Sequence, residues 1–339
     1  SWSPVFRDDV MSTPIPAIRF LIHDGTLGSS MMRFDGDLRS LAHFDVEDRS
    51  YPFVLLPPGP KVAIIGAAGG KEILASLYFQ AEHVTGVELN PVTVSLLKTH
   101  FADFTGHLTE NPRVTLVNAE GRSFLGASRD RYDLVWYVAP DSYAAMNAAT
   151  SGAFVLSESY LYTREMVVEA LKHLTDDGLV VAQFGEISFE AKPNRTVRYL
   201  GTAREAFRQL GIEDFARHVL VATAPGFGEV MSASVVMKKT PFTEADVRAF
   251  TERATRVEGA VVRFAWPRKN AEGPVSAAIT RAPELLRAWY QAYPFDVRPV
   301  TDDSPFFWHF VRFRDTIWPP RDAPAYNIEE GIGERLLLV

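Results

Sequence analysis

The chain has 339 residues, of which 47% are hydrophobic and 23% charged, a balance typical of a folded protein with a sizeable core. Its formal net charge of −7 and the lack of a dense run of lysine and arginine argue against a nucleic-acid-binding surface. Because the chain contains no cysteine, disulfides, thiol nucleophiles and cysteine-ligated metals are excluded.

The N-terminal 57 residues carry short β-like pieces at 17–23 and 30–34. Asp24-Gly25 and Asp35-Gly36 follow these pieces, and Asp-Gly is a preferred sequence of tight hairpin turns. We therefore expect a small N-terminal β region, which leads through a proline-rich linker into the main sheet.

A nucleotide-binding turn is indicated after residues 62–65, an apolar run that is rich in β-branched side chains and typical of a buried parallel strand. Gly66, Ala67, Gly69 and Gly70 follow close behind it. Glycines in such a turn let the backbone approach a bound ligand closely.

The next two elements complete the start of a βαβ unit. A helix pattern covers 72–80, and a second apolar strand over 83–89 carries Glu88 near its end. The spacing from Gly66 to Glu88 is close to the ~20 residues that separate a nucleotide-binding turn from its ribose-binding acid. We expect the carboxylate of Glu88 to bind ribose hydroxyls.

The class of nucleotide follows from the glycine spacing and from the third strand. A dinucleotide-binding pattern would require glycines where Ala68 and Lys71 stand. The third strand, 114–118, leads instead to a second acid, Glu120, which is suited to the amino group of an adenine. Two acids without a pyrophosphate-binding pattern favour S-adenosylmethionine (SAM), and the alternative is a sheet whose turn binds nothing.

Strands and helices alternate from residue 61 to residue 239. Further strands are expected at 132–138, 179–184, 219–223 and 232–238, and helices at 91–104, 158–174 and 196–210. The pattern predicts an α/β fold with a doubly wound, mostly parallel, seven-stranded sheet, whose last two strands form an antiparallel pair at one edge.

Three parts of the chain are thus expected. They are a small β region over 1–57, a nucleotide-binding domain over 61–239, and an irregular extension over 240–339 with helices at 242–256 and 282–290.

Several motifs, in their order along the chain, resemble the spermidine synthase-like branch of the class I SAM methyltransferase fold. They are the glycine turn, Glu88-Leu89-Asn90-Pro91, Glu120-Gly121-Arg122, Tyr132-Asp133-Leu134-Val135 and Leu156-Ser157-Glu158. The resemblance covers most of the chain, including the small β region with its Asp-Gly turn. It implies a Rossmann-like fold with SAM or decarboxylated SAM as cofactor. The implied cofactor contacts are the glycine turn, Glu88, Leu89, Asn90, Glu120 and Gly121.

The segment after the fourth strand departs from the parent family. True spermidine synthases carry two aspartates there, and the first of them orients and deprotonates the attacking amine. Aligned from Asp133, this chain has Val138 in place of the first aspartate and keeps only Asp141. The glutamine that normally follows the Asp-Gly turn is missing as well, since residues 26–28 read Thr-Leu-Gly. Asp141 is therefore the candidate base or amine anchor, and a helix N-cap is its alternative role.

Other residues could line a pocket for a small acceptor. The candidates are Tyr143, Glu158, Tyr160, Tyr162 and the turn residue Asp24. Taken singly, each of the first four is also explained as a packing or capping residue.

Two further clusters of charged residues can be explained either by a function or by a structural role. Asp302-Asp303 could hold a metal or an amine, or could cap a turn while the aromatic residues 306–308 fill the core. Arg195, Arg198 and Arg204 have helical spacing and predict a solvated helix face. The eight histidines show no metal-binding spacing.

Residues 157–163 and 301–307 resemble a subgroup in which the SAM domain is fused to membrane helices. The chain starts without Met and stops within the apolar run 336–339, as a piece of a longer protein would; a natural C-terminal helix is the alternative. No internal apolar run reaches the ~18 residues that cross a bilayer. We expect a cytoplasmic domain of a membrane protein with apolar spans beyond its ends, and a homodimer is one option.

These features predict a SAM-dependent transferase that moves an aminopropyl or methyl group to an amine or another small polar acceptor. One alternative is a plain O- or N-methyltransferase, and a second is a non-catalytic SAM or nucleotide sensor domain of a membrane protein. With Val138 in place of an aspartate, we expect little spermidine to form from putrescine.

Overall fold

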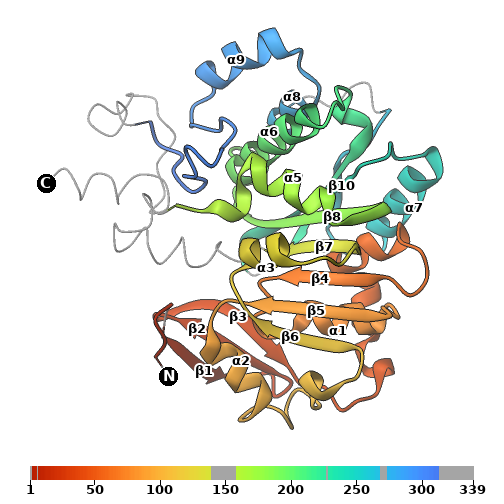
Figure 1. Cartoon of the computed structure of the whole chain (residues 1–339), viewed down its shortest axis with the longest axis vertical. Helices are drawn as coiled ribbons and strands as arrows, with labels where there is room; N and C mark the ends of the chain where they lie inside the picture. The colour runs from red at the N-terminus through yellow and green to blue at the C-terminus, as the bar shows by residue number, and fades with distance from the viewer. Residues whose placement is uncertain (1, 6, 139–157, 227, 268–272, 313–339) are drawn as a thin grey trace, which may run out of the picture.

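The computed structural model describes residues 2–5, 7–138, 158–226, 228–267 and 273–312 (Figure 1). A large sheet runs through the molecule with the strand order β11-β9-β10-β8-β7-β4-β5-β6. Its strands are β4 (Lys61–Ile65), β5 (His83–Glu88), β6 (Val114–Asn118), β7 (Tyr132–Val138), β8 (Leu174–Ile187), β9 (Val219–Pro225), β10 (Val230–Lys238) and β11 (Val261–Phe264).

The central part of this sheet is parallel. Strands β8, β7, β4, β5 and β6 all run in one direction, whereas β10 is antiparallel to both β8 and β9. The predicted α/β fold with a mostly parallel, doubly wound sheet is thereby confirmed. The strand count of seven was too low, because β11 from the C-terminal extension pairs antiparallel with β9 and adds an eighth strand.

Helices cover both faces of the sheet. One face packs against α1 (Lys71–Tyr78), α2 (Pro91–Lys98), α7 (Glu244–Thr255) and the 3-10 segments η1 (Leu38–Val46), η2 (Asp48–Ser50), η3 (Pro52–Val54) and η4 (Leu108–Glu110). The other face packs against α3 (Gly121–Ala127), α5 (Arg164–Lys172), α6 (Asn194–Gln209), α8 (Pro274–Thr280), α9 (Pro283–Ala292), η5 (Tyr160–Tyr162) and η6 (Phe215–His218). Each face therefore has its own apolar core.

Two predicted helices are shorter than expected. The helix expected over 158–174 begins only at Arg164, because the hydroxyl of Thr163 accepts a hydrogen bond from the Met166 amide and acts as an N-cap. The helix expected over 91–104 ends at Lys98.

The small N-terminal sheet is a three-stranded antiparallel unit of β1 (Asp8–Ser12), β2 (Ile18–His23) and β3 (Thr26–Met32). Asp24 and Gly25 connect β2 to β3 with φ angles of 46° and 91°, the left-handed pair of a tight hairpin turn, as the sequence predicted. The strand β1 was not predicted. In Figure 1 the unit lies beside α2 and β6.

The C-terminal segment fills the core on the α5–α6 side. The ring of Phe307 is fully buried, stacks on Tyr162 at 4.5 Å between ring centroids, and lies 5.6 Å from Phe184. Trp308 meets Tyr162 edge-on at 5.6 Å. The expected core-filling role of these aromatic residues is confirmed.

The prediction of a solvated arginine face on α6 was wrong. Arg195 and Arg198 are buried, because residues 296–310 lie over this helix. The guanidinium of Arg198 donates hydrogen bonds to the carbonyls of Phe306 (3.0 Å), Phe307 (2.6 Å) and Asp296. Burial lowers the pKa of Arg198 to about 10, so the group stays charged at neutral pH.

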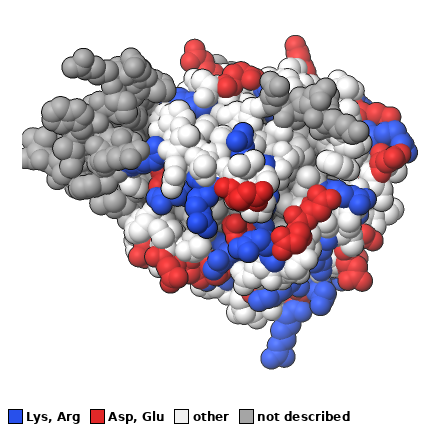
Figure 2. Space-filling model, turned by 90° about the horizontal axis from the view of Figure 1, so that it is seen from above, with Lys and Arg blue, Asp and Glu red and all other residues white. Residues whose placement is uncertain are grey.

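The distribution of surface charge and the character of the helices bear on possible partners. On the face seen in Figure 2, acidic and basic side chains are interspersed rather than gathered by sign. Among helices of the described residues, none combines the length and apolar character that a membrane span requires.

We predict that Gly69→Ala destabilises the protein, because a Cβ at this position would lie 2.0 Å from the carbonyl oxygen of Ser30 in β3. Overpacking of this kind typically costs about 1–3 kcal/mol in the free energy of unfolding, which denaturant titration measures. Gly126→Ala in α3 is the matched control, since its Cβ would meet no atom within 4 Å. The control should be neutral or slightly stabilising, and equal stability of the two variants would contradict the close approach of β3.

Candidate functional site

The candidate site lies at the carboxyl edge of the parallel strands. The chain order reverses between β4 and β7, which are neighbours in the sheet. In open α/β sheets, ligands bind outside the carboxyl ends of the strands at such a reversal. Figure 1 shows the heads of β4 and β5 pointing to the side of the molecule on which the small sheet lies.

The glycine turn connects β4 to α1 and is fixed against β5. Gly66, Ala68 and Gly70 have positive φ angles of 85°, 41° and 84°, which give the turn its tight path. The amides of Gly66 and Ala67 both donate to the carbonyl of Val87, each at 2.9 Å.

Glycine is required at position 69 for a different reason from the expected approach of a ligand. Its Cα faces the backbone of Ser30 so closely that no side chain fits. This glycine therefore admits the small sheet against the turn, whatever ligand the turn binds.

Glu88 ends β5 and holds the turn with its side chain. Its Oε2 accepts a hydrogen bond from the Ala68 amide (2.9 Å), and its Oε1 accepts one from the Asn90 amide (2.7 Å). Burial raises the pKa of Glu88 above its ordinary value, although these backbone N–H groups act in the opposite direction. A carboxylate has about four acceptor positions, so hydrogen bonds to ribose hydroxyls are compatible with the two seen.

The two residues after Glu88 have opposite surroundings. Leu89 is 48% exposed and presents an apolar side chain at the carboxyl edge, suited to the face of a nucleobase. Asn90 is fully buried, and its side chain accepts from the Val92 amide as the N-cap of α2. Its side chain therefore fixes the start of α2.

Glu120 is the N-cap of α3. Its carboxylate accepts hydrogen bonds from the amides of Arg122 (2.8 Å) and Ser123 (2.7 Å). A Cβ on the following Gly121 would lie 2.5 Å from Ile65, so this glycine lets α3 start close to β4. The predicted adenine-binding acid thus lies at the expected end of β6 and also holds the start of a helix.

A buried acid that the sequence did not reveal lies near Glu88. Asp8 of β1 accepts a hydrogen bond from the hydroxyl of Thr93 in α2 (2.6 Å), and its carboxylate lies 3.2 Å from Nε2 of His23. Burial raises the pKa of Asp8 and lowers the pKa of His23 to about 4, so the imidazole is neutral at physiological pH. No sequence signal marked Asp8, because β1 itself was not recognised.

The proposed acceptor residues are placed only in part. Asp141 and Tyr143 lie outside the described residues. Glu158 and Tyr160 are both exposed, and the Tyr160 hydroxyl donates to a carboxylate oxygen of Glu158 at 3.1 Å. These two residues thus form one polar pair at the surface.

The other two acceptor candidates lie elsewhere. Tyr162 is fully buried in the aromatic core, the packing role that the sequence left open. Asp24 is exposed in its hairpin turn, where its carboxylate accepts from the amide of Arg7 at 2.9 Å.

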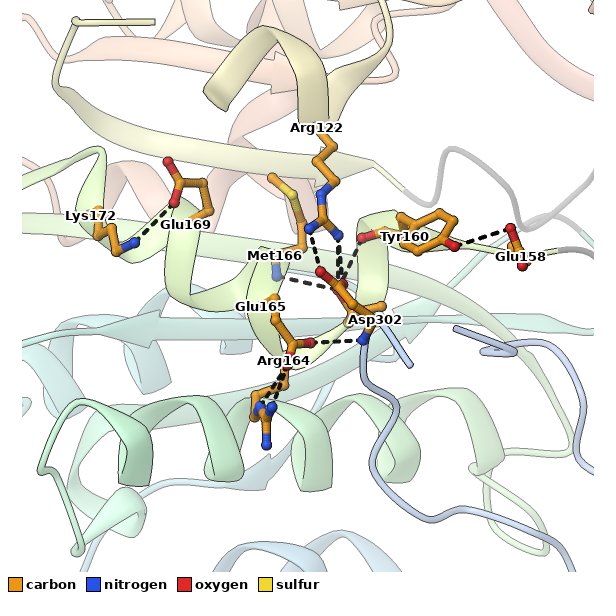
Figure 3. A network of polar contacts seen from close by, with 10 residues as sticks. Arg122, Glu158, Tyr160, Arg164, Glu165, Met166, Glu169, Lys172 and Asp302 are labelled. Carbon is orange, nitrogen blue, oxygen red and sulfur yellow. Dashed lines mark hydrogen bonds and ion pairs between the residues drawn. The ribbon is translucent and has the colours of Figure 1, made fainter. Parts of the chain in front are cut away.

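Arg122 and Asp302 join the first turn of α3 to the C-terminal segment (Figure 3). The two nitrogens of the Arg122 guanidinium donate to the two carboxylate oxygens of Asp302 at 2.7 and 2.5 Å, and the Thr163 hydroxyl donates to the same carboxylate at 2.7 Å. The backbone amide of Asp302 in turn donates to Glu165 at 2.9 Å. The guanidinium also lies 5.5 Å from the centre of the Tyr160 ring.

The environment of Asp302 answers one question that the sequence left open. Its carboxylate forms an ion pair rather than capping a turn. In the part of the chain that the structure describes, no group of acidic or histidine side chains is arranged to hold a metal ion. The hydrogen bonds from Arg122 lower the pKa of Asp302, so it is ionised at neutral pH.

A family model and curated relatives match this chain, and they point to the same protein family. The model of the spermine/spermidine synthase domain matches residues 49–246. A polyamine aminopropyltransferase of Korarchaeum cryptofilum is 27% identical over 257 residues, which cover 75% of this chain and 70% of the relative. One from Streptococcus pneumoniae is 29% identical over 140 residues, 41% of this chain and 44% of the relative's length.

Solved structures agree on the fold. A spermidine synthase from Thermotoga maritima superposes with a TM-score of 0.50 at 16% identity and covers 85% of both chains. A probable spermidine synthase from Corynebacterium glutamicum also gives 0.50 at 16% identity, over 79% of this chain and 91% of its own.

Asp302→Asn should lower the free energy of unfolding by about 1 kcal/mol near pH 7, because the bidentate ion pair is lost while about a third of each side chain is exposed to solvent. The pKa of Asp302 is lowered in the folded state, so below the ordinary aspartate value the unfolded chain binds more protons. The stabilisation is therefore complete above that value and lost as the pH falls through the lowered pKa.

Denaturant unfolding at several pH values tests this prediction. The difference between wild type and variant should vanish in acid. The control is Asp303→Asn, since Asp303 is exposed and adjacent in sequence. A difference between wild type and Asp302→Asn that did not depend on pH would contradict a role for the ionised carboxylate.

Proposed function

The chain belongs to the spermine/spermidine synthase family, and on that premise we propose that it is a transferase that moves an aminopropyl group from decarboxylated SAM to a small amine. The observation that carries the proposal is the placement of Glu88. Its carboxylate lies at the carboxyl end of β5, directly against the glycine turn, with the exposed side chain of Leu89 beside it.

The described residues suit an adenosine group in a specific orientation. Glu88 would bind the ribose hydroxyls, Leu89 would contact the adenine ring, and Glu120 at the end of β6 would accept from the adenine amino group. Strands β5 and β6 are neighbours in parallel register, with Glu88 opposite Asn118, so Glu88 and the nearby Glu120 lie at the carboxyl ends of adjacent strands. The sulfonium centre would then lie near the glycine turn.

The reaction is an in-line displacement. The lone pair of an uncharged amine attacks the carbon next to the sulfonium, the carbon–sulfur bond breaks with its electrons going to sulfur, and 5′-methylthioadenosine leaves as a neutral thioether. The amine loses one proton. Positioning of the amine and removal of that proton are the tasks of the protein.

Other features remain predictions of the sequence. Asp141 is proposed as the proton-accepting or amine-anchoring residue. Attachment to membrane helices, a cytoplasmic location and a homodimer likewise remain expectations. Methyl transfer from SAM is the competing chemistry, and the products distinguish it.

Glu88→Ala should weaken the binding of 5′-methylthioadenosine at least tenfold in titration calorimetry, because each hydrogen bond to a charged group contributes about 1.5–3 kcal/mol. Glu88→Gln keeps one acceptor oxygen and should lie between wild type and the alanine variant. Glu82→Ala, which changes an exposed glutamate at the start of the β5 segment, should bind like wild type. Unchanged affinity of the alanine variant would remove Glu88 from the site.

We expect the wild type to convert decarboxylated SAM to 5′-methylthioadenosine in the presence of at least one member of a panel of amines, with the matching aminopropylated amine detected by mass spectrometry. Asp141→Asn should reduce the rate by ~10²–10⁴-fold if this residue is the general base. S-adenosylhomocysteine as the product of SAM would show methyl transfer instead. Turnover of neither donor would contradict an enzymatic function, and full activity of the variant would leave Asp141 as a helix cap.

A further inference from the structure

We propose that Asp48 binds the ammonium group of the amine acceptor and so supplies, from η2, a carboxylate that β7 lacks at Val138. This inference rests on the proposed function, whose acceptor it concerns. It also adds an acidic group to those that the sequence suggested for the acceptor, of which Asp141 is the one kept on the segment after β7.

Asp48 lies on the sheet face and at the strand level of Val138. Gln183 of β8 is in parallel register with Val138, so the two side chains point to the same face. The amide of Gln183 donates to Oδ2 of Asp48 at 3.2 Å. The hydroxyl of Ser232 donates to the same oxygen at 2.6 Å.

The carboxylate lies toward the carboxyl edge of the sheet. Ser232 pairs with Gly185, which is two residues beyond Gln183 toward the end of β8. A carboxylate that contacts both Gln183 and Ser232 therefore lies level with or beyond the last residue of β7. Val138 itself packs against the same apolar cluster as Tyr51, on the side of the sheet that η2 covers.

A chain of ion pairs connects Asp48 to the glycine turn. Arg49 donates to Oδ1 of Asp48 at 2.9 Å and to Oε1 of Glu72 at 3.1 Å. Glu72 lies in the first turn of α1, which begins directly after Gly70. Asp48 is thus placed between the proposed donor site and the end of β7, where a nucleophile must lie to attack the donor.

The charges of this network favour one more cation. Glu47, Asp48 and Glu72 supply three carboxylates, whereas Arg49 and Lys71 supply two positive charges, the latter through its 2.8 Å contact with Glu47. Burial would raise the pKa of Asp48, but the charge of Arg49 and the Ser232 hydrogen bond outweigh it and hold this pKa below the ordinary value. Asp48 is therefore ionised, and three donors leave acceptor capacity on an ionised carboxylate.

A buried hydroxyl gives an independent reason to expect a ligand here. Tyr51 is fully buried, and its hydroxyl has no hydrogen-bond partner among the described residues. Burial and then the nearby Asp48 charge raise the pKa of Tyr51, so the phenol stays protonated close to that carboxylate. Buried hydroxyls are normally paired, and an ammonium group, which carries three donors, would satisfy both the Tyr51 oxygen and Asp48.

The test is calorimetric titration of 1,4-diaminobutane into protein saturated with 5′-methylthioadenosine, with 1,4-butanediol as the uncharged probe. Asp48→Asn should weaken diamine binding at least tenfold, while the affinity for 5′-methylthioadenosine changes less than twofold. Asp45→Asn is the matched control, because Asp45 is a carboxylate three residues earlier that pairs with Arg253 and Tyr78 instead. It should bind the diamine like wild type.

Tyr51→Phe keeps the test valid if Asp48→Asn does not fold, because its hydroxyl has no protein hydrogen bond to lose. We expect unchanged or higher thermal stability and diamine binding that is weakened threefold or more. Unchanged diamine affinity of both variants, or a wild type that binds the diol as well as the diamine, would overturn the inference. If diamine binding depends on Asp48 but no donor is turned over, the role of Asp48 stands and the proposed function is refuted. If turnover occurs and does not depend on Asp48, the proposed function stands and the role of Asp48 is refuted.

Discussion

The hydrogen bonds that Glu88 accepts from two backbone amides fix the relative position of the elements around the site. One carboxylate oxygen holds the glycine turn and the other holds the start of α2, so the two loops after β4 and β5 cannot move apart without leaving a buried charge unsolvated. The small sheet then rests on the glycine turn and on α2, through the backbone of Ser30 against Gly69 and through Asp8 against Thr93. The carboxyl edge is therefore organised before any ligand arrives.

Local patterns predicted the elements whose neighbours lie nearby in the sheet. The strands at 114–118 and 132–138 coincide with β6 and β7. The apolar run of β7 marks a strand that is covered on both faces, whereas β6, at the sheet edge, alternates buried and exposed side chains. The strands β1 and β11 escaped prediction. Their sequences, DDVMS and VVRF, are short and carry charges, and each becomes a strand through pairing at a sheet edge that the local pattern does not record.

The site was predictable to the same degree. Glu88 and Glu120 stand where a strand ends, and strand ends can be counted along a sequence. The environments of Asp8 and Asp48 depend on partners 85 and 184 residues away, Thr93 and Ser232. Both acids lie before the regular alternation of strands and helices begins, so no periodic pattern in the sequence marks them. Helical spacing likewise suggested an exposed face for Arg198, because the segment that covers it lies about a hundred residues further on.

The burial of Arg198 restricts how this protein can change during evolution. Its guanidinium binds carbonyl oxygens of the backbone at Asp296, Phe306 and Phe307, and these oxygens are present whatever side chains stand there. Substitutions in that segment are therefore tolerated at positions that do not fill the aromatic core. A lysine at position 198 could not reach all three carbonyls with one ammonium group in the same geometry. In related sequences, an arginine at position 198 and the segment that covers it should consequently be present together or absent together.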